Sequence, residues 1–154
     1  MTPKSGAQKS ASSRTAPPKA GDKPPSWPKL QPLVPSSDLS LFTLVPDQIL
    51  LIHNFWTSTL CSTLVKFASS NVELQTTPSQ RKRGDALRIN DRYQVKDQSL
   101  ANRLWENTAL RELVLGVGGE EDRRKLWGGE PVGVNPNIRV YRYRKGQFFG
   151  PHCE

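Results

Sequence analysis

The residues best placed to do chemistry stand near the C-terminus, where His152 and Glu154 are separated by a single residue. In an extended segment the side chains of residues i and i+2 point to the same face. An imidazole and a carboxylate in this arrangement can converge on one cation. They would supply two ligands of the 2-His-1-carboxylate set, which binds non-haem Fe(II) and leaves coordination positions open. H-x-E alone is a weak motif, and its meaning depends on the segment before it.

That segment alternates as a strand would, and it breaks at Gly146, where a tight turn is possible. Phe148 and Phe149 could supply an apolar wall, and Pro151 stiffens the backbone before the His. Alternation divides the strand into two mixed faces, one with Arg139, Tyr141, Tyr143 and Lys145 and the other with Ile138, Val140, Arg142 and Arg144. Periodicity does not say which face is buried, but an aromatic and basic face suits an anionic ligand.

Taken together, Arg142-Tyr143-x-x-Gly146-Gln147-x-Phe149-x-x-His152-x-Glu154 resembles the motif that opens the catalytic core of the prolyl 4-hydroxylase-like 2-oxoglutarate/Fe(II) dioxygenases. In that family the segment usually reads R-Y-x-x-G-Q-x-[FY]-x-x-H-x-D. The stretch from Lys82 to Arg92 is similar to K-R-G-E-A-x-R-x-N-D-R, which occurs in fungal members of the superfamily. The resemblance covers roughly residues 46–154, and its C-terminal motif is the specific part.

The resemblance implies a role for each matching residue. His152 and Glu154, with a distal His, would hold Fe(II), and Tyr143 would donate its phenol to the carboxylate of 2-oxoglutarate. Such enzymes couple the oxidative decarboxylation of 2-oxoglutarate to succinate with hydroxylation of a substrate C–H bond, and ascorbate serves as reductant. The substrate, whether a protein or a small molecule, is not indicated.

Two departures from the family pattern bear on activity. The carboxylate is Glu154 instead of the usual Asp, one methylene longer. No histidine follows His152, so the distal His and the basic residue that anchors 2-oxoglutarate are missing. We therefore expect an α+β chain with the N-terminal helices and first strands of a double-stranded β-helix, truncated and with little activity alone. The alternative on activity is a non-catalytic oxygenase fragment.

The elements that must position this site follow from hydrophobic patterning. A short buried strand is expected over 48–53, a second over 72–75, and a partly alternating strand over 86–95. Thr57 and Asp97 can cap helices over 58–69 and 98–107. Residues 116–137, rich in glycine, are expected to form a long surface loop. The first helix carries an apolar stripe of Leu60, Cys61, Leu64, Val65 and Ala68.

Three side-chain expectations accompany these elements. Cys61 lies within the apolar stripe and is expected to be a small core residue. His53 is expected to be structural, because the third ligand in the resembling family lies downstream of H-x-D and not upstream. The polar residues Arg88, Asn90, Asp91 and Arg92 are expected to pair locally through hydrogen bonds and ion pairs, framing the site entrance.

The N-terminal residues differ in composition from the rest of the 154-residue chain. Residues 1–36 are rich in Pro, Ser and Lys without periodicity, which predicts a disordered tail before a domain over 37–154. Of the net charge of +8, +5 comes from residues 1–30. No apolar run approaches the length of about 20 residues that spans a bilayer. With two cysteines and no secretory signal, a cytoplasmic or nuclear location is expected, with the mitochondrion as the lesser alternative.

A nucleic-acid-binding module is the alternative from another functional class. Lys145-Gly146-Gln147-Phe148-Phe149 faintly resembles the K-G-F-G-F core of an RNA-recognition strand, and the N-terminal tail is basic. However, Gln147 replaces the first stacking aromatic, and no βαββαβ pattern surrounds the segment. We therefore expect neither a nucleic-acid nor a membrane partner.

Overall fold

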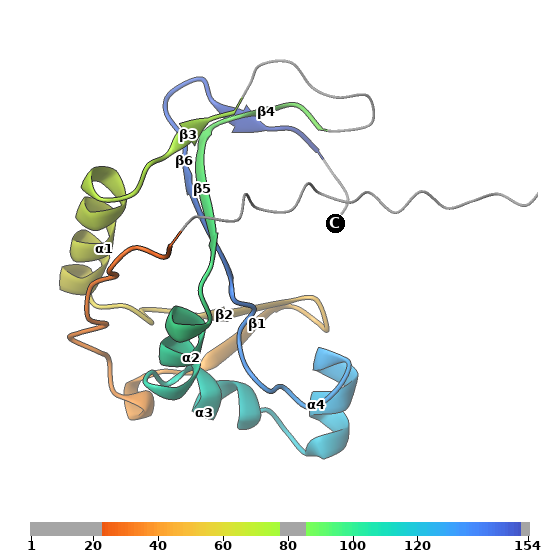
Figure 1. Ribbon diagram of the computed structural model, residues 1–154. Helices are drawn as coiled ribbons and strands as arrows, with labels where there is room; N and C mark the ends of the chain where they lie inside the picture. Colours follow the sequence, from red (N-terminus) through yellow and green to blue (C-terminus); the bar gives the residue numbers. More distant parts are fainter. Residues whose placement is uncertain (1–22, 78–85, 152–154) are drawn as a thin grey trace, which may run out of the picture.

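Helices and small antiparallel sheets alternate along residues 23–77 and 86–151, the parts of the chain that the computed structural model describes (Figure 1). This arrangement confirms the expected α+β class. The elements are η1 (Ser36–Asp38), β1 (Leu41–Val45), β2 (Ile49–Ile52), α1 (Ser58–Ser70), β3 (Gln75–Thr76), β4 (Arg88–Ile89), β5 (Asp91–Lys96), α2 (Gln98–Glu106), α3 (Leu110–Leu115), α4 (Glu120–Trp127), β6 (Asn137–Arg142) and β7 (Phe148–Phe149).

The longest strand pairing is between β5 and β6, which form the centre of the molecule in Figure 1. They pair antiparallel over their full length, from Asp91 opposite Arg142 to Lys96 opposite Asn137. β3 adds to the other edge of β5, giving the order β3-β5-β6. β4 pairs with β7, and β1 with β2 in a hairpin. The strand expected over 86–95 is therefore two strands, which belong to different sheets and are separated at Asn90.

Helix α1 begins where its cap predicts. The Thr57 hydroxyl accepts a hydrogen bond from the Leu60 backbone N–H at 3.2 Å, which satisfies one of the unpaired donors of the first turn. Leu60 is fully buried, but Val65 is 65% exposed and Cys61 is also exposed. The expectation that Cys61 lies in the core is therefore wrong. The helix buries Leu60 fully and Leu64 and Ala68 in part, whereas Cys61 and Val65 lie outside the contact.

The segment before η1 packs against the domain, in contrast to the disordered tail expected over 1–36. Leu30 is buried, and Leu33 forms a β-bridge with Trp56. The Trp27 ring contacts the Phe67 ring with centroids 5.4 Å apart. For residues 23–36 the expectation is thus wrong, because the two large apolar side chains, Trp27 and Leu30, find partners despite the surrounding prolines. Residues 1–22 lie outside the described part of the chain.

Asp97 connects this N-terminal segment to the cap of α2. Its carboxylate accepts one hydrogen bond from the Leu100 N–H and another from the Trp27 indole N–H, both at 2.9 Å. The cap confirms the helix predicted from Asp97, which ends at Glu106. The residues buried on this helix are Leu100, Ala101 and Trp105. A single carboxylate, itself buried, therefore fixes both the start of α2 and the position of residue 27.

The long loop expected over 116–137 contains a helix, α4, so that expectation is wrong in part. Its first turn is acidic (Glu120, Glu121, Asp122) and its last turn basic, which complements the helix dipole. Gly128 ends the helix in the left-handed conformation, at φ +73°. A helix without buried residues carries no apolar stripe, which is why hydrophobic patterning did not reveal it.

No helix in the described ranges has both the length and the apolar composition needed to cross a bilayer. The longest, α1, has 13 residues, against the roughly 20 that a membrane-spanning helix needs.

Candidate functional site

The strand β6 leads directly into the segment that carries the predicted site. Tyr143 follows its last residue and is 47% exposed. The chain then turns: the Gln147 N–H donates to the Arg144 carbonyl at 2.9 Å, and the Arg144 N–H donates to the Gln147 side-chain oxygen at 2.7 Å. Gly146 occupies the left-handed region at φ +84°, as the tight turn requires. Gln147 is thus a residue of the turn itself.

After the turn, β7 is held by β4. Arg88 lies opposite Phe149 and Ile89 opposite Phe148, and the Arg88 guanidinium stacks 4.0 Å from the centroid of the Phe149 ring. The Gly150 N–H donates to the Leu87 carbonyl at 2.8 Å. A Cβ at position 150 would approach that carbonyl oxygen to 3.3 Å, so glycine allows the two backbones to come close. The backbone is therefore anchored up to two residues before His152.

The predicted metal ligands, His152 and Glu154, lie outside the described residues, as do residues 82–85 of the resembling upstream stretch. Elsewhere, in 23–77 and 86–151, no three residues of the types His, Cys, Asp and Glu come together as a metal site would require. His53 is exposed in the connection between β2 and α1, and its ring is 5.7 Å from that of Phe42.

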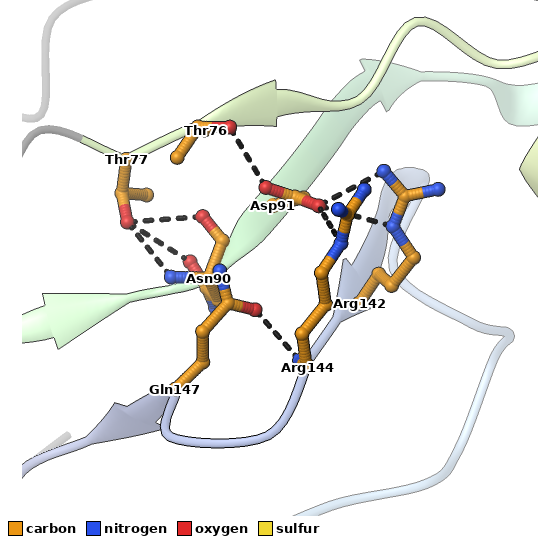
Figure 2. Close-up of polar contacts among 7 residues, drawn as sticks. All are labelled: Thr76, Thr77, Asn90, Asp91, Arg142, Arg144 and Gln147. Atoms are coloured by element: carbon orange, nitrogen blue, oxygen red, sulfur yellow. Dashed lines mark hydrogen bonds and ion pairs between the residues drawn. The ribbon is translucent and has the colours of Figure 1, made fainter.

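An ion pair joins the two segments that carry the family resemblance (Figure 2). Arg142 donates from Nε and Nη2 to one Asp91 carboxylate oxygen at 3.0 and 2.9 Å, across the β5–β6 ladder. The other oxygen accepts from the Thr76 hydroxyl at 2.8 Å, and Arg144 Nε lies 3.5 Å from the first. Asp91 is only 4% exposed, so its charge depends on these partners.

The expected local pairing of Arg88, Asn90, Asp91 and Arg92 is therefore only partly correct. Arg92 does pair locally, donating to the Gln94 side-chain oxygen at 2.6 Å. Asp91, however, pairs with Arg142, 51 positions away in the sequence, and Arg88 packs on an aromatic ring. The reason is the register: Asp91 points to the face on which Thr76 and Arg142 also lie.

Asn90 and Thr77 form a second polar cluster at the junction of β4 and β5 (Figure 2). The Asn90 N–H donates to the Thr77 hydroxyl oxygen at 3.0 Å, and the Thr77 N–H donates to the Asn90 carbonyl at 2.8 Å. Asn90 is fully buried, and its Nδ2 has no partner among the described residues. The sequence reading missed both Thr76 and Thr77, although two β-branched hydroxyl residues before a proline are a recognisable sheet-edge signal.

Burial also decides which face of β6 is covered, a question that alternation left open. Ile138, Val140 and Arg142 are half-buried, whereas Arg139 and Tyr141 are exposed. The aromatic and basic face is thus the accessible one.

The partners of Asp91 make its contribution to stability depend on pH. Its hydrogen bond from Thr76, and then those from Arg142, hold the pKa of Asp91 below its ordinary value of 3.8. A depressed pKa contributes stability that is present above the unfolded-state value and is lost as the pH falls through the folded-state value. Asp91→Asn should therefore be less stable than wild type at pH 7, and the difference should shrink below about pH 4.

Urea unfolding at pH 7 and at pH 3 measures that difference. Asp38→Asn, which changes an exposed carboxyl in η1, is the control and should leave the pH dependence close to wild type. A gap between Asp91→Asn and wild type that stays constant from pH 7 to pH 3 would contradict the assignment.

Comparison with known proteins found no matching family model, no matching curated protein and no matching solved structure. The geometry brings the two motif segments together through β5–β6 and β4–β7.

Proposed function

We propose that this chain provides the first metal ligands and the 2-oxoglutarate-binding tyrosine of a prolyl 4-hydroxylase-like 2-oxoglutarate/Fe(II) dioxygenase. One observation carries the proposal. The two stretches that resemble the family are far apart in sequence but adjacent in space, joined by the ion pair of the buried Asp91 with the half-buried Arg142 and by the pairing of β4 with β7. A chance likeness in two separate stretches gives no reason for them to meet.

The donor chemistry of the site fits the metal. An imidazole nitrogen and a carboxylate oxygen are the ligand types of non-haem Fe(II) sites, and both come from the segment that β4 anchors at Gly150. When bound, Fe(II) and 2-oxoglutarate would supply the oxidising chemistry that hydroxylates a C–H bond. In the family the third protein ligand lies downstream of this motif, so His53 is not proposed for that role.

The described residues have separate tasks in this proposal. Tyr143 donates its phenolic O–H to a carboxylate oxygen of 2-oxoglutarate. The Tyr143 side chain, just after β6, is exposed and therefore accessible to this ligand. Phe148 and Phe149, which precede the proposed ligands in β7, would supply apolar side chains beside the metal site. Asp91 and Arg142 are positioning residues, because they keep β5 and β6 in register and thereby hold the turn that presents the ligands.

We infer that β5 and β6 are early strands of a double-stranded β-helix, with β7 leading to the metal. The location remains the one expected from composition, cytoplasmic or nuclear.

Tyr143→Phe tests the cofactor role. It removes one charge-assisted hydrogen bond and should weaken 2-oxoglutarate binding to the Fe(II)-loaded chain about tenfold or more. Isothermal titration under anaerobic conditions is the measurement. Tyr141→Phe is the matched control, since the Tyr141 side chain is similarly exposed and Tyr141 lies two residues earlier, within β6. Equal weakening in both variants would contradict a specific role for Tyr143.

A further inference from the structure

One face of the sheet β3-β5-β6 is open and basic. In an antiparallel ladder, residues directly opposite each other project to the same face. Arg92 lies opposite Tyr141, Gln94 opposite Arg139, and Lys96 opposite Asn137. Lys96, Arg139 and Tyr141 are exposed on this side, while the opposite face carries the buried Asp91 and Val95. We refer to the six residues 92, 94, 96, 137, 139 and 141 as the basic face.

The basic face holds three cations and no acid. Among the described residues, no carboxylate lies within ion-pair distance of Arg92, Lys96 or Arg139. This differs from other parts of the surface, where Arg111, Arg123, Arg124 and Lys125 each have an acidic partner. Like charges gathered on one face without counter-charges favour an anionic partner.

The shape of this surface favours an extended partner. The basic face runs along β5 from Arg92 to Lys96, which at about 3.4 Å per residue is roughly 14 Å, longer than most small metabolites. Side chains on one side of an extended peptide repeat about every 7 Å, so Arg92 and Lys96, which are four residues apart on β5, are separated by two such repeats, or roughly 14 Å. The Gln94 oxygen holds the Arg92 guanidinium at 2.6 Å, which limits its conformations before a carboxylate binds.

The aromatic residues argue for a peptide over a single-stranded nucleic acid. Sheets that bind RNA stack bases on aromatic side chains from neighbouring strands. Here Tyr141 is the aromatic member of the basic face, and β5 contributes Arg92, Gln94 and Lys96 to it. Planar guanidinium groups bind carboxylates in bidentate geometry.

We propose that the basic face binds an acidic, extended peptide segment, and that the substrate of the proposed oxygenase is a protein with alternating carboxylates beside the modified residue. That the bound peptide belongs to a substrate rests on the proposed function. The binding itself does not depend on it. β6 runs from the basic face directly to Tyr143, so a peptide lying along it would reach the end of the strand from which the metal ligands follow.

The test is fluorescence anisotropy with the full chain and a labelled (Asp-Ala)5 peptide, without metal or 2-oxoglutarate. The uncharged (Asn-Ala)5 peptide and a ten-nucleotide oligo(U) serve as comparison probes. Arg92→Gln/Arg139→Gln should weaken (Asp-Ala)5 binding about tenfold, as the loss of two exposed ion pairs predicts. Arg111→Gln/Arg124→Gln removes the same net charge from α3 and α4 and should change it less than about twofold.

The outcomes separate the two proposals. His152→Ala should bind (Asp-Ala)5 as wild type does, so failed iron binding and failed peptide binding are independent results. Equal affinity for (Asp-Ala)5 and (Asn-Ala)5 would overturn the inference, as would unchanged binding by Arg92→Gln/Arg139→Gln. Tighter binding of oligo(U), lost in the same double variant, would make the basic face a nucleic-acid surface and would also overturn it.

Discussion

His152→Ala should weaken Fe(II) binding by the full chain by at least about 100-fold. Disturbing groups that merely orient a ligand typically costs 10–100-fold in metal affinity, and this change removes one of the proposed ligands. The sequence contains two histidines, so His53→Gln controls for the loss of an imidazole elsewhere in the chain. It changes the other imidazole, which is exposed beside Phe42, and should leave the affinity unchanged. Anaerobic Fe(II) titration by calorimetry measures both.

The same titration examines the unusual carboxylate. Glu154→Asp restores the residue usual in the resembling family and should retain iron binding, whereas Glu154→Ala removes the hard oxygen donor and should lose it. Equal affinity in wild type and Glu154→Ala would remove Glu154 from the site. If Glu154→Asp lost iron binding and Glu154→Gln retained it, side-chain length would matter more than charge, contrary to the proposed role.

Leu60→Ala should lower the free energy of unfolding by about 2–5 kcal/mol, the range for truncating a buried leucine. Leu60 is the only described apolar residue with no exposed surface, so truncating its side chain leaves a cavity. Because the Thr57 cap fixes the start of α1, the helix does not shift to fill that cavity. Chemical denaturation followed by circular dichroism measures the change.

Val65→Ala, on the same helix, provides the matched control. Its side chain is 65% exposed, and the expected change is within about 0.5 kcal/mol of zero. If both substitutions cost the same, burial on α1 would not follow the structure described here.

Helix starts could be predicted from the sequence because capping is local. Thr57 and Asp97 each accept a hydrogen bond from the N–H three residues later, a contact that requires nothing beyond the first turn. Which residues of the helix are covered depends on distant partners. Periodicity therefore placed Cys61 and Val65 in the apolar stripe, although the structure leaves both side chains exposed.

Composition misled in two places for physical reasons. Average polarity predicted disorder over residues 23–36, yet two apolar anchors, Trp27 and Leu30, are enough to hold a proline-rich segment when a buried carboxylate accepts the indole N–H. Glycines hid α4, although an acidic first turn, a basic last turn and a following Gly128 were all visible signals of a helix.

For the candidate site, the sequence predicted which residues take part but not how they pair. Asp91 and Arg142 both belong to the resembling stretches, but their pairing depends on the register of β5 against β6, which no local pattern encodes. Thr76 and Thr77 lie outside those stretches and were missed. Their roles follow from β3 lying beside β5.

Paramagnetic broadening by Mn(II), which binds the same nitrogen and oxygen donors as Fe(II), tests the central claim most directly. On adding substoichiometric Mn(II) to the isotope-labelled chain, the amide signals of residues 152–154 should broaden first, followed by those of Gly150 and its backbone partner Leu87, and His152→Ala should abolish the effect. Broadening centred instead on the acidic first turn of α4, at Glu120 to Asp122, and unchanged by His152→Ala would contradict the metal site proposed here.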